Sequence, residues 1–545
     1  KHISSTTSKE NYNSNEEFEK STELSEKEIF DLNDLFNDDL IDVEYISSTT
    51  SEEHYINDEK SKKRNECPTE MNWTEDYKNA LKYLYGTKEI VKDKDKALEL
   101  LLEQQNNVLA VHDIGIIYKT NGFDEISQKY FSSAFKGFHN ILNTIKNLDY
   151  VHYRIGKMYS LGYGIDQSDE KAIEHWKKSK NNKNSQFSLG NAYKYGKGVK
   201  QSDKEAYDWY YKSAKQDNIF ADYAVANCLF YGLGTNKNIE NAQRHYSNAF
   251  DGFIKLEKDS PTDSVRYKIG MMYLDGKGTE KNEEKAKEFL LLSAEDKNKS
   301  ALHQLGRLSE KEEKYLEAED FFLKAIEQEN ENSKISLAKM YLKQDCFDSD
   351  KKNSALDSLH DFADEKENDN VQYFLGKYYL EKENFELAEK YLLLSADQDN
   401  SYAQFALGNF YKFGIDKYQS DEEAFNWYLK SADNDNPFAK YSTGDCYKQG
   451  KGTEKNKDKA NEYYTKAFSD FMDIEEDNPN DFARYKIGMM YLDGKGTEKN
   501  EEKAKEFILL SAEDKNKSAL HQLGRFLEKE EKYLEAEDFF LKAIE

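Results

Sequence analysis

The residue types that most often do chemistry in proteins are present in this chain, but their spacing fits no common catalytic or metal-binding motif. Paired glycines recur, as in Gly196-Lys197-Gly198, but no Gly-Lys-Ser/Thr sequence follows them and no strand pattern precedes them. These pairs therefore indicate turns rather than phosphate-binding loops. We expect a chain that is not an enzyme and that has no cofactor and no metal site. No H-E-x-x-H or other metal-ligand spacing is found at His112, His152, His175, His245, His303 or His521.

The spacing of the cysteines indicates the cellular compartment in which the protein is found. Cys67, Cys228, Cys346 and Cys446 form no C-x-x-C pair, which excludes the usual zinc-ribbon spacing and a disulfide framework. Free thiols are typical of a reducing compartment, so we expect a cytoplasmic protein. Because the chain starts at Lys1 rather than Met, a signal peptide removed earlier is the alternative that stays open.

The charge of the chain limits the partners that it can bind. Its net charge is −27, and an acidic surface repels both the phosphates of nucleic acids and anionic lipids. No run of apolar residues approaches the 18 that a membrane-spanning helix needs. We therefore expect no direct binding to nucleic acid and no membrane association.

Residues 1–70 differ in composition from the rest of the chain. They hold 8 Lys or Arg against 19 Asp or Glu, and such a segment buries too little apolar area to offset its ordering entropy, so we predict disorder. Within it, residues 29–46 (IFDLNDLFNDDLIDVEYI) are acidic and carry apolar side chains at roughly helical spacing. They indicate either a helix that forms when it docks in a partner's groove or a linker without a specific role. The apolar residues are Phe30, Leu32, Leu35, Phe36 and Leu40.

Residues 71–545 are built from repeats. Arg266–Glu327 (266–327) returns at Arg484–Glu545 (484–545), 218 residues later, with only three positions changed. Inside this block a Leu/Ile-Gly pair recurs after about 36 residues, and the same pair is found along most of the chain. A period of this length is typical of a solenoid, in which each unit buries its apolar face only against its neighbours. We predict about a dozen consecutive helix pairs.

Residues 185–218 (SQFSLGNAYKYGKGVKQSDKEAYDWYYKSAKQDN) show how one unit is built. Gly190 is small at a position where a neighbouring helix must pass close. Gly196 and Gly198 end the first helix and turn the chain, because glycine tolerates a positive φ. Ser202 then starts an S-x-x-E capping box and with it the second helix.

These motifs carry a resemblance. A first helix with A/Y-x-x-L-G-x-x-Y, a G-x-G loop, and then D-x-x-K/E-A-x-x-W/Y-x-x-x-A is similar to the Sel-one-like repeat family, a relative of tetratricopeptide repeats. The resemblance covers about residues 72–545, although the units at Leu305, Leu375 and Leu523 lack the G-x-G loop and resemble plain tetratricopeptide units. It implies an all-α fold, an α/α solenoid wound as a right-handed superhelix, which acts as a scaffold for protein–protein contacts without chemistry of its own.

Three units extend their second helix, at the sequences around Phe138, Phe253 and Phe471. Such an extension is either a local elongation without a binding role or a projection that frames a partner. The sequence does not decide between these two interpretations.

Two columns of residues are candidates for binding a protein or peptide partner. If the first helix of each unit lines the concave side, as in the resembled family, the rings two positions before each Leu/Ile-Gly pair face an extended or helical peptide. The alternative is that the same rings pack against the next repeat. Two positions after the first residue of the pair the side chain varies between units, as we expect of a position that faces solvent or a ligand. The rings are Tyr153, Phe187, Tyr223, Tyr267, Tyr373, Phe405, Tyr441 and Tyr485, and the candidates of the second column are Asn191, Asn227 and Asn409.

A second function is also consistent with the sequence. The order of an acidic spacer, NWTEDYKNALKYLYG, AVHDIGIIY and YVHYRIGKMY resembles the array that follows the relaxase domain in mobilisation proteins of some low-GC Gram-positive bacteria. In this alternative the chain is the C-terminal interaction region of a larger DNA-nicking protein. The residues that would nick DNA are not in this chain, so no catalytic role is carried over.

Overall fold

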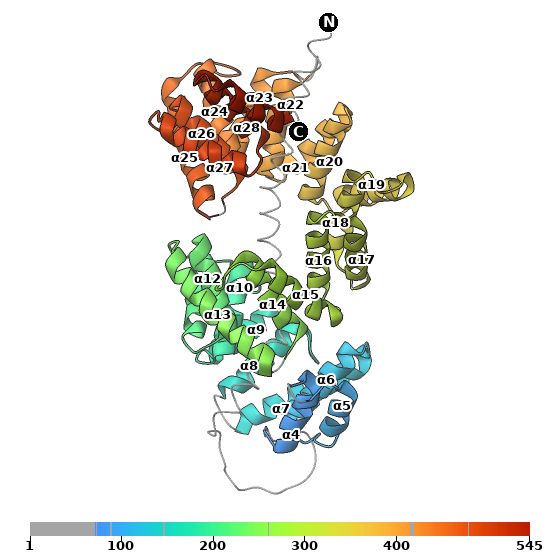
Figure 1. The fold of residues 1–545 in the computed structure, drawn as a ribbon. Helices are drawn as coiled ribbons and strands as arrows, with labels where there is room; N and C mark the ends of the chain where they lie inside the picture. The colour runs from blue at the N-terminus through green and yellow to red at the C-terminus, as the bar shows by residue number, and fades with distance from the viewer. Residues whose placement is uncertain are drawn as a thin grey trace. The chain divides into compact units, whose positions relative to one another are not determined.

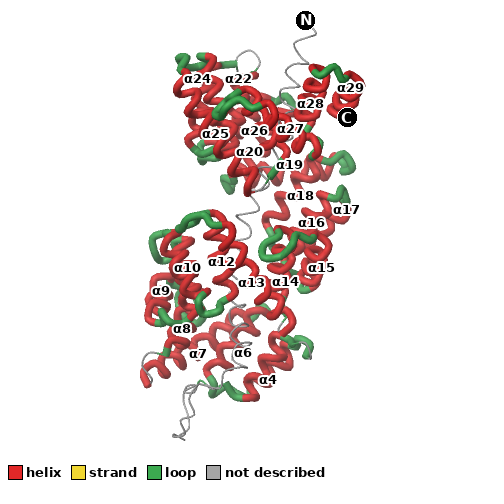
Figure 2. The backbone as a smooth tube through the Cα atoms, turned by 60° about the vertical axis from the view of Figure 1, so that its left-hand side comes forward, coloured by secondary structure: helices red, strands yellow, loops and turns green. Residues whose placement is uncertain are grey.

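The protein consists of helices throughout its described part, as predicted. The computed structural model describes residues 71, 73–87, 90–144, 148–259, 261–414, 419–477 and 479–544, and these residues form 26 α-helices, α4 to α29, without a strand (Figures 1 and 2). The acidic segment 1–70, its predicted helix at 29–46 and Cys67 lie outside the described residues.

The helices follow one another as pairs, in which a first helix (the A helix) packs on a second (the B helix). Contacts divide the described helices into two units, the first ending at Ser336 and the second beginning at Leu337, inside α18. The helices of the first unit are α4 (Glu75–Tyr85), α5 (Lys94–Leu102), α6 (Val108–Thr120), α7 (Asp124–Thr144), α8 (Asp149–Leu161), α9 (Asp169–Lys178), α10 (Lys183–Tyr195), α11 (Asp203–Ala214), α12 (Ile219–Tyr231), α13 (Ile239–Asp259), α14 (Asp263–Asp275), α15 (Glu283–Glu295), α16 (Lys299–Lys311) and α17 (Tyr315–Glu327).

The second unit continues the same alternation of A and B helices. It starts within α18, whose residues belong to both units. Its helices are α18 (Glu331–Lys343), α19 (Ser349–Asp364), α20 (Asp369–Glu381), α21 (Phe385–Ala396), α22 (Ser401–Phe413), α23 (Asp421–Asp433), α24 (Pro437–Gln449), α25 (Lys457–Asp477), α26 (Asp481–Asp493), α27 (Glu501–Glu513), α28 (Lys517–Lys529) and α29 (Tyr533–Ile544).

The ends of the helices are set by side-chain caps and by glycines. The Ser202 hydroxyl accepts a hydrogen bond from the Glu205 backbone N–H at 3.3 Å, which confirms the predicted start of α11. Most A helices begin with an Asn cap instead, such as Asn218 before α12. Gly196 ends α10 in the left-handed conformation, with φ 67°, as expected.

The glycine of each Leu/Ile-Gly pair is required by the packing of A on B. A Cβ atom at Gly190 would lie 2.4 Å from the Tyr210 ring, so no larger residue fits between α10 and α11. The same contact occurs between Gly408 and Tyr428 at 2.4 Å, and between Gly156 and Trp176 at 2.5 Å. The predicted reason for this small residue is therefore confirmed.

The second glycine of the G-x-G loop has a role that the sequence did not reveal. A Cβ atom at Gly234 would lie 2.2 Å from the backbone oxygen of Asp203, which belongs to the B helix of the preceding repeat. Gly278 has the same relation to Tyr246 at 2.3 Å, and Gly496 to Tyr464 at 2.2 Å. The loop therefore joins neighbouring repeats as well as turning the chain.

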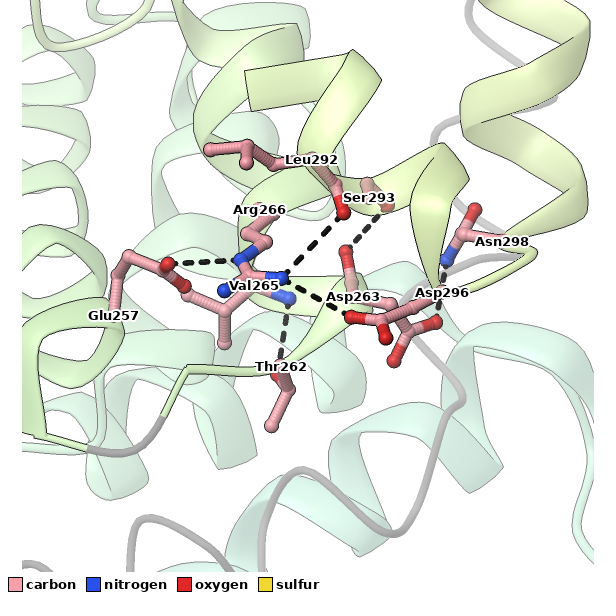
Figure 3. Close-up of polar contacts among 9 residues, drawn as sticks. All are labelled: Glu257, Thr262, Asp263, Val265, Arg266, Leu292, Ser293, Asp296 and Asn298. Atoms are coloured by element: carbon pink, nitrogen blue, oxygen red, sulfur yellow. Dashed lines mark hydrogen bonds and ion pairs between the residues drawn. The ribbon is translucent and has the colours of Figure 1, made fainter. Parts of the chain in front are cut away.

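A polar network fixes two of the long helices, α13 and α25, to the repeat that follows each of them, and Figure 3 shows the network at α13. Arg266 of α14 donates from Nε to Glu257 of α13 at 2.8 Å and from Nη1 to Asp296, after α15, at 3.1 Å. Ser293 of α15 donates to the backbone oxygen of Asp263 at 2.6 Å. The same network recurs around Arg484, which bonds to Glu475 at 3.0 Å and to Asp514 at 2.8 Å, although Glu257 and Glu475 lie before the two copies of the duplicated block.

The predicted extension of three B helices is confirmed. Helices α7, α13 and α25 have 21 residues each, whereas a regular B helix such as α11 has 12. Phe138, Phe253 and Phe471 on these helices are fully buried, so the extensions pack within the array.

Candidate functional site

The predicted ring column lies along the A helices, and its exposure differs between the two units. In the first unit Tyr153, Phe187, Tyr223 and Tyr267 are buried, with no more than 2% of any side chain exposed. In the second unit the members are half-buried, so part of each ring is accessible. These half-buried members are Tyr373, Phe405, Tyr441 and Tyr485.

Each ring contacts its own repeat and the next one. The Phe187 ring centroid lies 5.6 Å from that of Tyr210 in the same repeat and 6.4 Å from that of Phe220 in the following A helix. Phe405 has the same relation to Tyr428, at 5.6 Å, and to Phe438, at 6.1 Å. Ring pairs at such distances stabilise packing, so the alternative that these rings pack between repeats describes the first unit. Whether any of them also contacts a partner stays a prediction.

The asparagine column has a structural role that was not predicted from the sequence. Tyr210 on α11 donates from its hydroxyl to Oδ1 of Asn191 at 2.6 Å, and Tyr246 on α13 donates to Asn227 at 2.5 Å. Asn409 accepts the same bond from Tyr428 at 2.6 Å. The expectation that this column faces solvent is wrong for Asn227, which is only 4% exposed because it closes this buried bond. Asn191 and Asn409 are half-buried, and their binding to a partner stays a prediction.

A lysine–tyrosine–aspartate group lies beside the ring column in the second unit. Lys495, in the loop after α26, donates from Nζ to the Tyr441 hydroxyl at 2.5 Å and to Oδ1 of Asp445 at 2.9 Å. The Tyr464 hydroxyl donates to the same Asp445 oxygen at 2.5 Å. Burial opposes the charge of the lysine, but its bonds to Tyr441 and Asp445 outweigh this and raise the pKa of Lys495.

A second lysine completes this surface, which we call the Tyr441 patch and define as Tyr441, Lys486 and Lys495. The Lys486 ammonium lies 5.2 Å from the centre of the Tyr441 ring, and that of Lys495 lies 4.4 Å from it. Cations at such distances are attracted to the negative ring face. Neither lysine was predicted from the sequence, although Lys486 directly follows a ring-column residue.

The first unit carries the counterpart of this group with one informative change. Asn227 stands where the second copy has Asp445, so it supplies no negative charge. Lys277, the counterpart of Lys495, lies 3.4 Å from Asp275 and 5.8 Å from the Tyr246 ring centre. The two copies therefore share their rings but differ in how the loop lysine is held.

A buried polar cluster joins α4, α6 and α8. The Tyr77 hydroxyl donates to Asp113 at 2.6 Å, and Arg154 donates from Nη2 to Nδ1 of His112 at 2.7 Å. All four side chains are at most 4% exposed. Nδ1 of His112 also lies 3.1 Å from Oδ1 of Asp113, and the burial of the four groups indicates a structural cluster.

The fold brings together two histidines that are 23 residues apart. Nδ1 of His152 lies 3.1 Å from Nδ1 of His175. Burial, reinforced by the neighbouring His152 and Lys178, lowers the pKa of His175 to about 4. Among the residues that the structure describes, no group of three or more His, Cys, Asp or Glu side chains is arranged to hold a metal ion.

None of the described helices, α4 to α29, is both long and apolar enough to cross a membrane.

In the described part of the chain, Cys228 and Cys446 are buried, and burial raises the pKa of their thiols to about 12 and about 11. Neither cysteine lies in the Tyr441 patch.

Comparison with solved structures finds other helical repeat proteins. A protective antigen of uropathogenic Escherichia coli strains, c5321, which displays an SLR fold, is 21% identical, with 86% of this chain and 91% of that chain covered and a TM-score of 0.32. A Sel1 repeat protein from Oxalobacter formigenes is 22% identical, covering 42% and 96%, with a TM-score of 0.32. Yeast Tom70 is 14% identical, covering 72% and 91%, with a TM-score of 0.39.

No curated protein matches the chain. The resemblance to mobilisation relaxases is not tested by any of these comparisons, and it stays a prediction.

The sequence model of one family matches nine segments, which together span more than half of the chain. They contain the Leu/Ile-Gly pairs and G-x-G loops whose contacts are described above. The segments are 80–103, 150–184, 183–218, 219–252, 265–298, 371–400, 401–436, 437–469 and 481–516, and the description of the family is "Sel1 repeat". The chain belongs to the Sel1 repeat family.

Proposed function

We propose that this chain is a non-catalytic scaffold that binds a protein or peptide partner along the ring column of its A helices. The observation that carries the proposal is the Tyr441 patch, where two lysines lie over the half-buried Tyr441 ring. Aromatic rings give large contact areas at low entropic cost, and they are enriched at the centres of interfaces. Scaffolding of this kind is typical of Sel1 and tetratricopeptide repeats.

The chemistry of the patch favours an acidic partner that also carries apolar side chains. The ammonium group of Lys486 attracts carboxylates, whereas that of Lys495 is already paired with Asp445, and the edge of the Tyr441 ring accepts apolar groups. The asparagine column adjoins the ring column. Because the tyrosine hydroxyl occupies Oδ1 of Asn191 and Asn409, their Nδ2 groups are the atoms with which they would contact a partner.

The test is affinity purification followed by mass spectrometry, with the wild-type chain and the Lys486→Glu variant as baits. The variant reverses one charge of the Tyr441 patch, so we expect it to lose the acidic partners that the wild type captures. Lys517→Glu is the matched control, because it makes the same charge change at an exposed lysine at the start of α28. Capture of the same partners by all three chains contradicts the proposal, provided that their melting temperatures agree.

A further inference from the structure

One stretch of the first unit has a charge opposite to that of the whole chain. Residues 175–202 hold seven lysines and neither Asp nor Glu, whereas the net charge of the chain is −27. No other stretch of this length in the sequence is without an acidic residue. It comprises the end of α9, all of α10 and the G-x-G loop that follows α10. The lysines are Lys177, Lys178, Lys180, Lys183, Lys194, Lys197 and Lys200.

The repeat fold does not require these lysines. The counterpart of the stretch, 218 residues later, is residues 393–420, which contain α22 and form the same hydrogen bond between a tyrosine and the asparagine column. They hold two lysines and three Asp, and only Lys194 has a lysine, Lys412, at its counterpart position. The other six lysines are therefore not needed for the packing of an A helix, and their shared charge has another role.

The lysines form two groups, one at each end of α10. Helix α10 has 13 residues, so at about 1.5 Å per residue the two groups lie roughly 20 Å apart. The first group is Lys177 and Lys178 in the last turn of α9, Lys180 in the loop, and Lys183 at the start of α10. The second group is Lys194 in the last turn of α10 and Lys197 and Lys200 in the G-x-G loop.

Several of these ammonium groups have no carboxylate of the described chain to neutralise them. Lys178 pairs with Glu174 at 2.6 Å. Lys177, Lys180 and Lys200 are exposed and form no ion pair within the described residues. Their charges can therefore attract the carboxylates of a ligand.

Lys194 differs from the other lysines because it is half-buried. Its ammonium group lies 5.3 Å from the centre of the Tyr195 ring. Burial, together with the charge of Lys268, lowers the pKa of Lys194 to about 8, although Cys228 and Asp203 oppose this shift. A carboxylate beside Lys194 favours its charged form and raises this pKa. An acidic ligand that contacts Lys194 therefore binds more weakly once the pH exceeds 8.

The residues that flank the stretch favour a short acidic peptide over a nucleic acid. A nucleic acid extends past α10 on both sides, where exposed carboxylates repel its phosphates. An extended peptide of about six residues spans the distance between the two lysine groups, at about 3.3 Å per residue. The flanking carboxylates are Glu170 and Glu174 on α9, and Asp203, Glu205 and Asp208 on α11.

We propose that α10 and the loops at its two ends bind an acidic segment of a protein partner, which places carboxylates at both lysine groups. This inference rests on the proposed function, because it takes the chain to be a scaffold for protein partners. It adds a second recognition surface, which lies in the first unit, whereas the Tyr441 patch lies in the second.

The test is the binding of two fluorescein-labelled peptides to the full chain, measured by fluorescence anisotropy. The peptide EEEGSGSEEE has two groups of glutamates whose centres lie roughly 23 Å apart when it is extended. The peptide EEEEEEGSGS has the same composition but a single group. We expect the first peptide to bind several-fold more tightly, because it alone reaches both ends of α10.

The variant Lys177→Ser with Lys180→Gln removes two charges of the first lysine group. It introduces the residues of the second copy, Ser395 and Gln398, so the fold is preserved. We expect it to bind EEEGSGSEEE several-fold more weakly than the wild type does. The matched control is Lys281→Ser with Lys299→Gln, which makes the same changes at two exposed lysines outside the stretch and should leave the affinity unchanged.

The pH dependence of binding tests the contact at Lys194. Between pH 7 and pH 9 the wild type should bind EEEGSGSEEE several-fold more weakly, because free Lys194 loses its proton in this range. Lys194→Arg keeps its charge throughout, so its affinity should stay constant. The same pH dependence in both chains would overturn the assignment of Lys194.

Three further results would overturn the inference. Equal affinity for the two peptides shows that charge alone attracts them, without a two-ended site. Unchanged binding by Lys177→Ser with Lys180→Gln shows that the peptide binds elsewhere. Tighter binding of an oligothymidine, lost in the same variant, shows that the ligand is a nucleic acid. The proposed function would survive each result, because it is tested at Lys486, and Lys486→Glu should leave the peptide affinity that depends on Lys177 and Lys180 unchanged.

Discussion

At the scale of single residues, the pairing of asparagine with tyrosine explains a column that was predicted to vary for reasons of binding. The column residue is Asn or Asp in four repeats, and in each the B helix carries a tyrosine 19 residues later that donates to it. Where the column has Lys157 or Met271, the B helix has Trp176 or Leu290 instead. This covariation within the chain was readable in the sequence, but only a known A–B register gives it a physical meaning.

The first prediction concerns the buried bond between Asn227 and Tyr246. Asn227→Ala leaves the Tyr246 hydroxyl without its acceptor in a buried site, which costs about 1–3 kcal/mol of local stability. Amide exchange in α12 and α13 should become faster. The double variant Asn227→Leu with Tyr246→Phe removes both polar groups and should recover most of the loss. Equal exchange in the wild type and Asn227→Ala would show that the bond contributes nothing.

The second prediction concerns the pH dependence of α8 and α9. The folded chain holds His175 neutral down to about pH 4, whereas in the unfolded chain it binds a proton near 6.5. Unfolding therefore takes up a proton between these values, and stability falls as the pH is lowered from 6.5 towards 4. His175→Asn should reduce this slope, as measured by exchange in α9 at several pH values. An unchanged slope would exclude His175 as its source.

At the scale of helices and loops, the sequence predicted the element boundaries well but not all of their purposes. The Leu/Ile-Gly pair, the Ser202 cap and the long B helices follow from local rules that act within one repeat. The second glycine of the G-x-G loop is required because a Cβ atom there would clash with the backbone of the preceding repeat. A rule that considers one repeat alone cannot predict this contact. For the same reason the pairing of Lys495 with Tyr441, 54 residues away, could not be predicted.

The third prediction compares the two glycines of one loop. Both Gly232 and Gly234 have positive φ, at 73° and 68°, so alanine at either position meets a left-handed penalty of about 1–2 kcal/mol. A Cβ atom at Gly234 would also lie 2.2 Å from the Asp203 oxygen, whereas at Gly232 the nearest atom is 3.6 Å away. Gly234→Ala should therefore lower the melting temperature clearly more than Gly232→Ala. Equal effects would show that the contact between repeats relaxes without cost.

At the scale of the whole molecule, the array is stabilised by contacts between consecutive helices, so its stability should be a sum of local terms. The Arg266 network follows the same rule, since its bonds all lie between residues 257 and 298. A defect in one repeat should therefore weaken its neighbours and leave distant repeats folded.

The fourth prediction tests this locality. Gly408→Val places a branched side chain where a Cβ atom alone would lie 2.4 Å from the Tyr428 ring. Amide exchange should become faster in α20 to α25 and stay unchanged in α8 to α15. Asn426→Val introduces the same side chain at an exposed position of α23 and serves as the control. Faster exchange everywhere would show that the array unfolds as one cooperative body.

The Arg266 network has a consequence for how such a chain changes over generations. Arg266 and Asp296 both lie in the segment that recurs at residues 484–545, so this pair is copied together when the DNA encoding it is duplicated, whereas Glu257 and Glu475 lie before the two copies. A duplicated segment therefore carries these hydrogen-bonding partners with it. Unequal crossing-over can lengthen the gene product in a single event, and the long helix before the new junction then has to supply only the glutamate that pairs with the arginine.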